Sequence, residues 1–238
     1  MSIQNIPILK KEQIEDKSNK MLLDFRKEIF LTPQHTPILE FVNHLQQNFD
    51  IIFQFNQSLG NSSNGKKILG QFRTNPYTIK IDTILTDDKR LKFVLAHELG
   101  HLVFHRNLKF SQEEYEIFTE TEIDFNTGKK NLVTDRDWLE WQANYFASCF
   151  LMPQNSFENA LLNVQSNLGI IKNSGIIYLD NQHNNINDFD RIKSEMSKIF
   201  MVNKTNIEYR LFDLNKINDQ RNLKVKNVWQ LINELKVC

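Results

Sequence analysis

The chain has 238 residues, a length that fits one large domain or two small ones. Its 29 Lys and Arg residues balance 29 Asp and Glu residues, which argues against a protein that works mainly by non-specific attraction to nucleic acid or acidic membranes. Two cysteines are too few for a disulfide framework or a thiolate zinc site, and no long uncharged apolar run predicts a membrane span. A bound transition metal would therefore need histidine and carboxylate ligands.

The first third of the chain predicts two amphipathic helices followed by a small sheet. Apolar residues first recur at helical spacing and then alternate with polar ones. The expected elements are helices at 11–30 and 37–49 and strands at 51–55, 68–73 and 77–83. We expect an antiparallel-type sheet. Its last strand could pair with an extended peptide by strand addition, or it could be an ordinary sheet edge.

The next predicted helix, at about 89–107, carries the pattern HExxH as His97-Glu98-Leu99-Gly100-His101. Residues four apart project from one helix face, so His97 and His101 can share one metal ion. Glu98 stands beside the first ligand and can reach a metal-bound water as a general base. The alternative is a set of solvated surface residues. The apolar flanks of the motif argue against it, because buried polar groups are costly unless they coordinate something.

Two further residues of this helix need an explanation. Gly100 costs about 1 kcal/mol of helix stability relative to alanine, so we expect it to let another backbone or a substrate come close. His105 extends the pattern to HExxHxxxH, but on a continuous helix it lies about 12 Å along the axis from His97. Both cannot reach one ion at about 2 Å. We expect His105 to end the helix near its negative dipole end, with a supporting role behind a ligand as the less favoured alternative.

A third ligand should come from another helix. The segment 111–134 predicts a short helix and a variable loop, and a strong helix follows at 135–151, where Met152-Pro153 ends it. One face of that helix carries a carboxylate, an amide and two small side chains: Glu140, Asn144, Ala143 and Ala147. From spacing alone, Glu140 is as well explained as a solvated surface carboxylate as it is as a ligand.

The last third of the chain predicts a mostly helical region. The expected elements are helices at 157–168, 189–200, 204–214 and 225–237, a strand at 175–179 and a polar turn at 180–187. A boundary near residue 170 would separate 1–170 from a C-terminal helical subdomain, 171–238, packed on it. Its helix–turn–helix pattern leaves nucleic-acid binding open, but no basic helix surface is evident, which favours a packing role.

Two motifs together resemble those of the ImmA/IrrE family of zinc metallopeptidases. Residues 93–101 read FVLAHELGH, and residues 140–153 read EWQANYFASCFLMP. The family shows F-x-L-A-H-E-L-G-H and then E-x-E-A-N-x-F-A-x-x-L-L-M-P. Gln142 stands where the family more often has Glu, which leaves Glu140 as the only carboxylate in the second motif. The similarity extends from about residue 10 to about residue 215.

The resemblance implies an α+β, zincin-like fold that is mostly helical, with a small sheet beside the HExxH helix. It implies that His97, His101 and Glu140 bind Zn²⁺ and that Glu98 is the base of an endopeptidase in domain 1–170. The implied partner is a protein substrate such as a helix-turn-helix transcriptional repressor, and no membrane.

Several alternatives stay open at the level of the sequence. The chain could instead be a non-catalytic zinc-containing regulator that acts by protein or DNA binding, although the intact Glu98 weighs against this. Mn, Fe or Co could replace zinc at such ligands. The N-terminus lacks the pattern of a secretory signal, so we expect a cytoplasmic protein.

Overall fold

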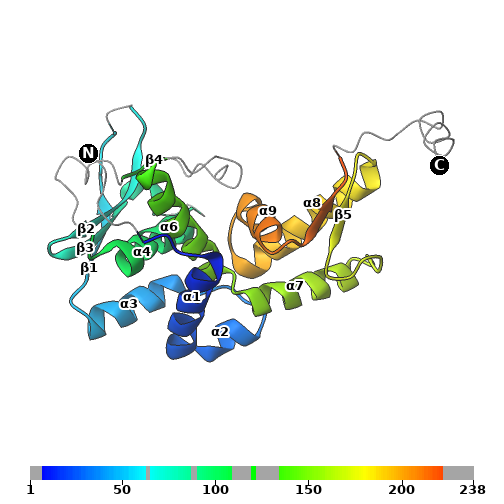
Figure 1. The fold of residues 1–238 in the computed structure, drawn as a ribbon, viewed down its shortest axis with the longest axis horizontal. Helices are drawn as coiled ribbons and strands as arrows, with labels where there is room; N and C mark the ends of the chain where they lie inside the picture. Colours follow the sequence, from blue (N-terminus) through cyan, green and yellow to red (C-terminus); the bar gives the residue numbers. More distant parts are fainter. Residues whose placement is uncertain (1–6, 63–64, 87–89, 109–118, 122–133, 222–238) are drawn as a thin grey trace, which may run out of the picture.

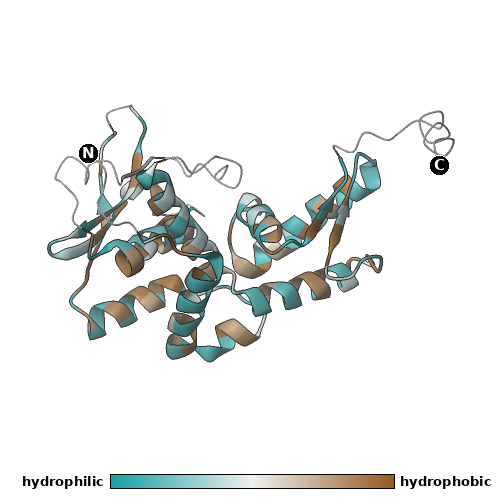
Figure 2. Ribbon diagram, in the orientation of Figure 1, coloured by the Kyte–Doolittle hydropathy of each residue, from teal (hydrophilic) through white to brown (hydrophobic). Residues whose placement is uncertain are grey.

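The chain folds into two lobes that α7 (Gln154–Asn167) connects (Figure 1). The computed structural model describes residues 7–62, 65–86, 90–108, 119–121 and 134–221, and every statement below concerns these residues. Figure 2 shows hydrophobic and hydrophilic residues interspersed along most helices, as expected for amphipathic elements that bury one face. Within the described ranges, no helix combines the length and the apolar character that a membrane span requires.

The N-terminal segment forms three helices rather than two. These are α1 (Lys11–Phe25), α2 (Lys27–Leu31) and α3 (Ile38–Asn48). The helix expected over 11–30 breaks at Arg26, whose backbone is extended with φ of −162°. The third helix starts directly after Pro37, as predicted, because the fixed φ of proline suits the start of a helix.

A four-stranded sheet packs beside these helices in the order β1-β3-β2-β4. Its strands are β1 (Ile52–Gln57), β2 (Ile68–Thr74), β3 (Tyr77–Asp82) and β4 (Thr119–Thr121). The expected antiparallel pairing holds for β2 with β3 and for β2 with β4, but β1 runs parallel to β3. The reason is the long connection from β1 to β2, which places β2 two positions away from β1 in the sheet. Strand β3 then lies between them.

The position of β3 corrects one expectation about peptide binding. This strand pairs with β1 along one edge and with β2 along the other, so neither edge can accept an extended peptide. Strand addition at 77–83 is therefore wrong, and so is the alternative of an ordinary sheet edge. In the described part of the sheet, the outer strands are β1 and β4.

Two helices carry the predicted motifs, and they pack along each other. The first, α4 (Leu91–His105), lies between the sheet and α6 (Asp135–Leu151) and is buried on nearly every side. The bounds of α6 match the prediction, because local chemistry sets both ends. Thr134 and Asp137 exchange hydrogen bonds of 3.1 and 2.9 Å in a capping box, and Met152-Pro153 ends the helix. Between α4 and α6, the described residues form strand β4; the short helix and variable loop expected within 111–134 otherwise fall on 109–118 and 122–133, which lie outside the described residues.

The second lobe contains two long helices and a pair of short strands. Its elements are β5 (Ile177–Leu179), α8 (His183–Phe200), α9 (Lys204–Asp213) and β6 (Ile217–Asp219), and β5 pairs in parallel with β6. Helix α8 starts within the segment expected to be a polar turn. The prediction placed its start too late because the first turns of α8 are exposed and carry no apolar stripe. The helix expected at 225–237 lies outside the described residues, and the division near residue 170 remains a prediction.

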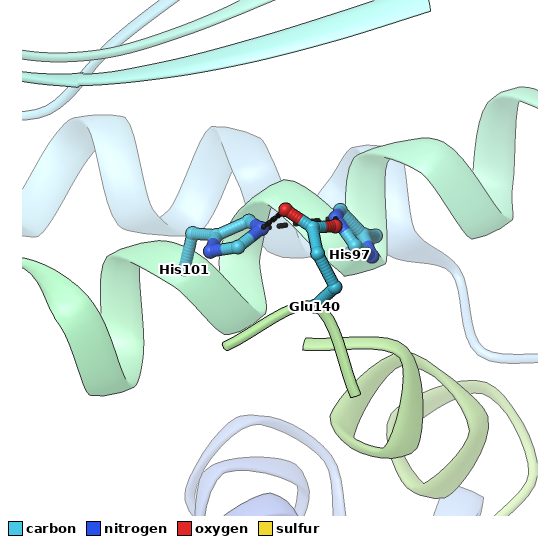
Figure 3. Close-up of side chains that lie close together, drawn as sticks. All are labelled: His97, His101 and Glu140. Atoms are coloured by element: carbon cyan, nitrogen blue, oxygen red, sulfur yellow. Dashed lines mark hydrogen bonds and ion pairs between the residues drawn. The ribbon is translucent and has the colours of Figure 1, made fainter. Parts of the chain in front are cut away.

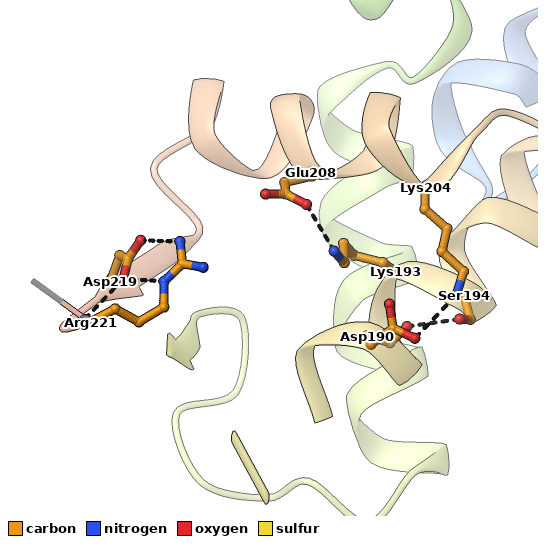
Figure 4. Close-up of polar contacts among 7 residues, drawn as sticks. All are labelled: Asp190, Lys193, Ser194, Lys204, Glu208, Asp219 and Arg221. Atoms are coloured by element: carbon orange, nitrogen blue, oxygen red, sulfur yellow. Dashed lines mark hydrogen bonds and ion pairs between the residues drawn. The ribbon is translucent and has the colours of Figure 1, made fainter. Parts of the chain in front are cut away.

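The basic side chains of α8 and α9 are all paired with acids. Between the two helices, Lys193 contacts Glu208 at 2.8 Å and Lys204 contacts Asp190 at 3.1 Å (Figure 4). Within α8 the ion pairs are Arg191–Asp188 and Lys198–Glu195, and the last basic residue, Arg210, is buried against Glu15. This neutralised surface gives no support to nucleic-acid binding through these helices.

Arg210 joins the two lobes. Its side chain is fully buried, and its guanidinium donates hydrogen bonds to the carbonyl oxygen of Met152 at 3.0 Å and to Glu15 of α1 at 2.6 Å. A third, weaker hydrogen bond of 3.4 Å reaches the sulfur of Cys149 in α6. Helix α9 is thereby fixed to both α1 and the end of α6.

Candidate metal centre

The close approach of α4 and α6 creates the site. A Cβ atom on Gly100 would lie only 2.9 Å from the Cα of Ala143, so the absence of a side chain lets the two helix backbones touch. This agrees with the expectation that Gly100 admits a neighbouring backbone. The contact brings the first turns of α6, which carry Glu140, over the histidine face of α4.

His97, His101 and Glu140 converge at this contact (Figure 3). The Nε2 atoms of the two histidines lie 3.0 Å apart, and the carboxylate oxygens of Glu140 lie 3.4 Å from His97 Nε2 and 3.8 Å from His101 Nε2. Ligand atoms of all three residues lie within 4.8 Å of one another, so this group could hold a metal ion. Both histidines are buried, and the Glu140 side chain is 23% exposed.

Each histidine is oriented by a hydrogen bond at its other ring nitrogen. His97 Nδ1 lies 2.8 Å from the amide oxygen of Asn144, and His101 Nδ1 lies 2.8 Å from His105 Nδ1. Because an amide oxygen only accepts, His97 carries its hydrogen on Nδ1 and has a lone pair on Nε2. Such outer contacts fix both the ring position and the tautomer of a metal ligand.

Burial favours the neutral imidazole of His101 and of His105. It lowers the pKa of His101 well below the usual range, and electrostatic interactions with His97, His105 and Arg136 lower it further. Burial also lowers the pKa of His105 to about 4, against an opposing contribution from its hydrogen bond with Gln142. Neutral imidazole is the form that binds a metal.

His105 differs from the expectation in one respect. It ends α4 and stays outside the group of three, as the helix geometry requires. However, it is buried and contacts His101 and Gln142, which is the alternative that was less favoured. The spacing of four residues that puts His105 one turn past His101 also brings the two rings together, with centroids 5.0 Å apart, and this was the signal available in the sequence.

The carboxylate of Glu98 lies against the sheet. Its side chain is fully buried, and its carboxylate occupies the space beside Gly70 of β2, where a Cβ atom would lie 2.5 Å from Glu98 Oε1. A glycine is therefore required opposite Glu98. Gly70 belongs to no recognised motif, and the signal available in the sequence was a glycine within a strand, which often marks such a close approach. The role of Glu98 as a base remains a prediction.

Tyr145, which lies one residue after Asn144, belongs to a different contact. Its ring stacks on Trp141 with centroids 5.5 Å apart, and Lys11 Nζ of α1 lies 5.2 Å from its centroid. Burial raises the pKa of its hydroxyl far above the usual range. These neighbours place Tyr145 in the packing of α6 on α1.

Comparison with known proteins adds a family to this geometry. Residues 62–172 match the family model described as the IrrE N-terminal-like domain, peptidase M78. This segment contains β2, β3, α4 and α6, and thus His97, Glu98, His101 and Glu140. None of the curated proteins compared with the chain matches it significantly.

Among solved structures, a Mycobacterium tuberculosis transcriptional regulator is similar at 13% sequence identity and a TM-score of 0.48. The match covers 84% of this chain and 55% of the regulator, so the chain spans just over half of that protein's length.

Proposed function

Since residues 62–172 belong to the IrrE N-terminal-like domain family of peptidase M78, we propose that this chain is a zinc-dependent endopeptidase that hydrolyses a peptide bond in a specific protein. The observation that supports this most strongly is the convergence of His97, His101 and Glu140 between two buried helices. The HExxH pattern supplies Glu98 directly beside the first of these residues.

The donor set fits zinc in its chemistry. Two imidazole nitrogens and one carboxylate are typical of catalytic zinc sites, whereas Ca²⁺ and Mg²⁺ prefer sites built from oxygen. Mn, Fe and Co remain alternatives with similar ligand preferences. When bound, zinc would lower the pKa of a water toward about 7 and polarise the scissile carbonyl.

The protein's own residues would carry out the proton transfers and the positioning. Glu98 accepts the proton of the attacking water and passes it to the leaving amine. Gly70 leaves the space that this carboxylate occupies, so Glu98 keeps its position against β2. Asn144 and His105 hold the rings of His97 and His101, and burial excludes bulk water from the group.

The substrate class rests on the family resemblance. We propose a protein substrate in the cytoplasm, with a helix-turn-helix transcriptional repressor as the specific case that the resemblance implies. Residues 1–170 would form the catalytic domain, and 171–238 would support it by packing. The paired charges of α8 and α9 favour this packing role over DNA binding.

A non-catalytic regulator that contains zinc is the competing function, and Glu98→Gln separates the two. The variant keeps the size of the side chain and all three proposed ligands but removes the base. We expect unchanged zinc content and a loss of cleavage by at least about 100-fold. The readout is mass spectrometry of new N-termini in a cytosolic extract treated with either protein, with Glu208→Gln on the distant helix α9 as the control.

The outcomes decide between the two functions. Cleavage by the wild type and by Glu208→Gln but not by Glu98→Gln supports the peptidase. Equal cleavage by Glu98→Gln removes Glu98 from the mechanism. If the zinc-loaded wild type produces no new N-termini, the non-catalytic function is favoured.

A further inference from the structure

We propose that His105 and Gln142 are positioning residues that fix the tautomer of His101, so that its Nε2 presents a lone pair to the metal. They form a hydrogen-bonded chain from the carbonyl oxygen of Pro7 through Gln142 and His105 to His101. This inference rests on the proposed function, because it assumes that His101 binds a metal. It assigns roles to two residues outside the HExxH motif and the predicted third ligand.

The direction of this chain of hydrogen bonds is set at its end at Pro7. Gln142 Nε2 lies 2.6 Å from the carbonyl oxygen of Pro7, a group that can only accept a hydrogen bond. The amide nitrogen must therefore face Pro7, which turns the amide oxygen toward His105. His105 Nε2 lies 3.0 Å from this oxygen and has to be the donor. The hydrogen of the His105 ring is thereby placed on Nε2.

The hydrogen position on His105 in turn fixes the hydrogen position on His101. A neutral His105 with its hydrogen on Nε2 has a lone pair on Nδ1, and this atom lies 2.8 Å from His101 Nδ1. His101 must donate across this contact, so its hydrogen is on Nδ1 and its Nε2 lone pair faces His97 and Glu140. The opposite direction would place a hydrogen on His101 Nε2 and block metal binding.

The side chains of this chain of hydrogen bonds are well isolated from solvent. The exposed fractions of His101, His105 and Gln142 are 2%, 1% and 0%. Water therefore does not readily replace a lost acceptor, and a misdirected hydrogen bond leaves a buried donor without a partner. His97 obtains the same result from one residue, Asn144, whereas His101 depends on a chain that reaches the N-terminal segment of the described structure at Pro7.

Two measurements test the chain. Nitrogen-15 NMR of the wild-type imidazoles should show His105 with its hydrogen on Nε2 both without and with zinc, and zinc-loaded His101 with its hydrogen on Nδ1. Zinc affinity is then measured by competition titration for His105→Leu, which removes the acceptor, and for His105→Asn, whose amide oxygen can replace Nδ1. We expect about 10- to 100-fold weaker binding for His105→Leu and binding within about threefold of the wild type for His105→Asn.

The control is His183→Leu, which removes an exposed histidine at the start of α8 and should leave the affinity unchanged. A His105 hydrogen on Nδ1, or wild-type affinity in His105→Leu, would overturn the proposal. Should the wild type bind no zinc, the proposed function fails, and the His105 tautomer still decides whether the chain runs in the inferred direction. A variant that does not fold leaves the wild-type NMR result decisive.

Discussion

Helix α6 carries a buried polar cluster at each end, and the two clusters are built differently. Its first turns present Glu140 and Asn144 to the histidines of α4, where three potential ligand atoms converge. Its end presents Cys149 and the carbonyl of Met152 to Arg210, where donors meet acceptors. Both clusters are largely buried. In the first, potential ligand atoms face one another, whereas in the second each acceptor faces a donor of Arg210.

The pKa directions follow this difference. In the Arg210 cluster, burial raises the pKa of Glu15, but the charge and hydrogen bond of Arg210 outweigh it and the net pKa is lowered. The pKa of Arg210 itself is raised, because its acidic neighbours outweigh burial. In the histidine cluster, burial dominates and the pKa values of His101 and His105 fall. Similar burial is thus accompanied by an ion pair at one end of α6 and by neutral imidazoles at the other.

The largest expected effect comes from opening the Arg210 cluster. Arg210→Met leaves Glu15 as a buried charge without its partner, so we expect the free energy of unfolding to fall by about 3–5 kcal/mol. Denaturant unfolding measures this. Lys204→Met breaks an exposed ion pair and should cost less than about 1 kcal/mol. If the two clusters are independent, folded Arg210→Met binds zinc like the wild type. A loss of zinc affinity in folded Arg210→Met would contradict this independence.

Gly100→Ala is expected to disturb the histidine cluster through the backbone. The new methyl group would clash with Ala143, so α4 and α6 must separate, at a cost of about 1–3 kcal/mol. Zinc affinity should fall as well, because Glu140 moves away from the histidines. Asn163→Ala, at an exposed position of helix α7, is the control and should change neither stability nor affinity appreciably. Unchanged affinity in Gly100→Ala would show that the helix contact does not set the ligand geometry.

The smallest expected effect is the pH dependence of the Arg210 cluster. Because the folded-state pKa of Glu15 lies below its usual 4.5, its ionised form stabilises the fold above about pH 4.5. This contribution is lost as the pH falls through the folded-state pKa. The stability difference between the wild type and Glu15→Gln should therefore be constant near pH 7 and shrink below pH 4.5. Urea unfolding as a function of pH measures it, and a difference that grows in acid would contradict the ion pair.

Local chemistry explains which parts of this structure could be predicted from the sequence. The bounds of α6 follow from a capping box and a proline, and the spacing in HExxH is a property of any helix. The α+β fold with a small sheet beside the HExxH helix was predicted correctly through the family resemblance.

Contacts between distant segments were not predictable in the same way. Arg210 and Glu15 meet across 195 positions, and Gln142 meets Pro7 across 135, so no local pattern marks either pair. The parallel pairing of β1 with β3 depends on the path of a connection rather than on strand composition. The contact of Gly70 with Glu98 likewise needs the sheet and α4 to be placed together.

The central claim is that His97, His101 and Glu140 hold one zinc ion, and the most direct test is zinc content after dialysis together with zinc affinity. We expect about one zinc per wild-type chain. Loss of a supporting residue costs about 10- to 100-fold in affinity, so loss of a ligand in Glu140→Ala should cost more than about 100-fold. Glu208→Ala in the distant lobe should bind like the wild type. Wild-type zinc content and affinity in Glu140→Ala would contradict the account.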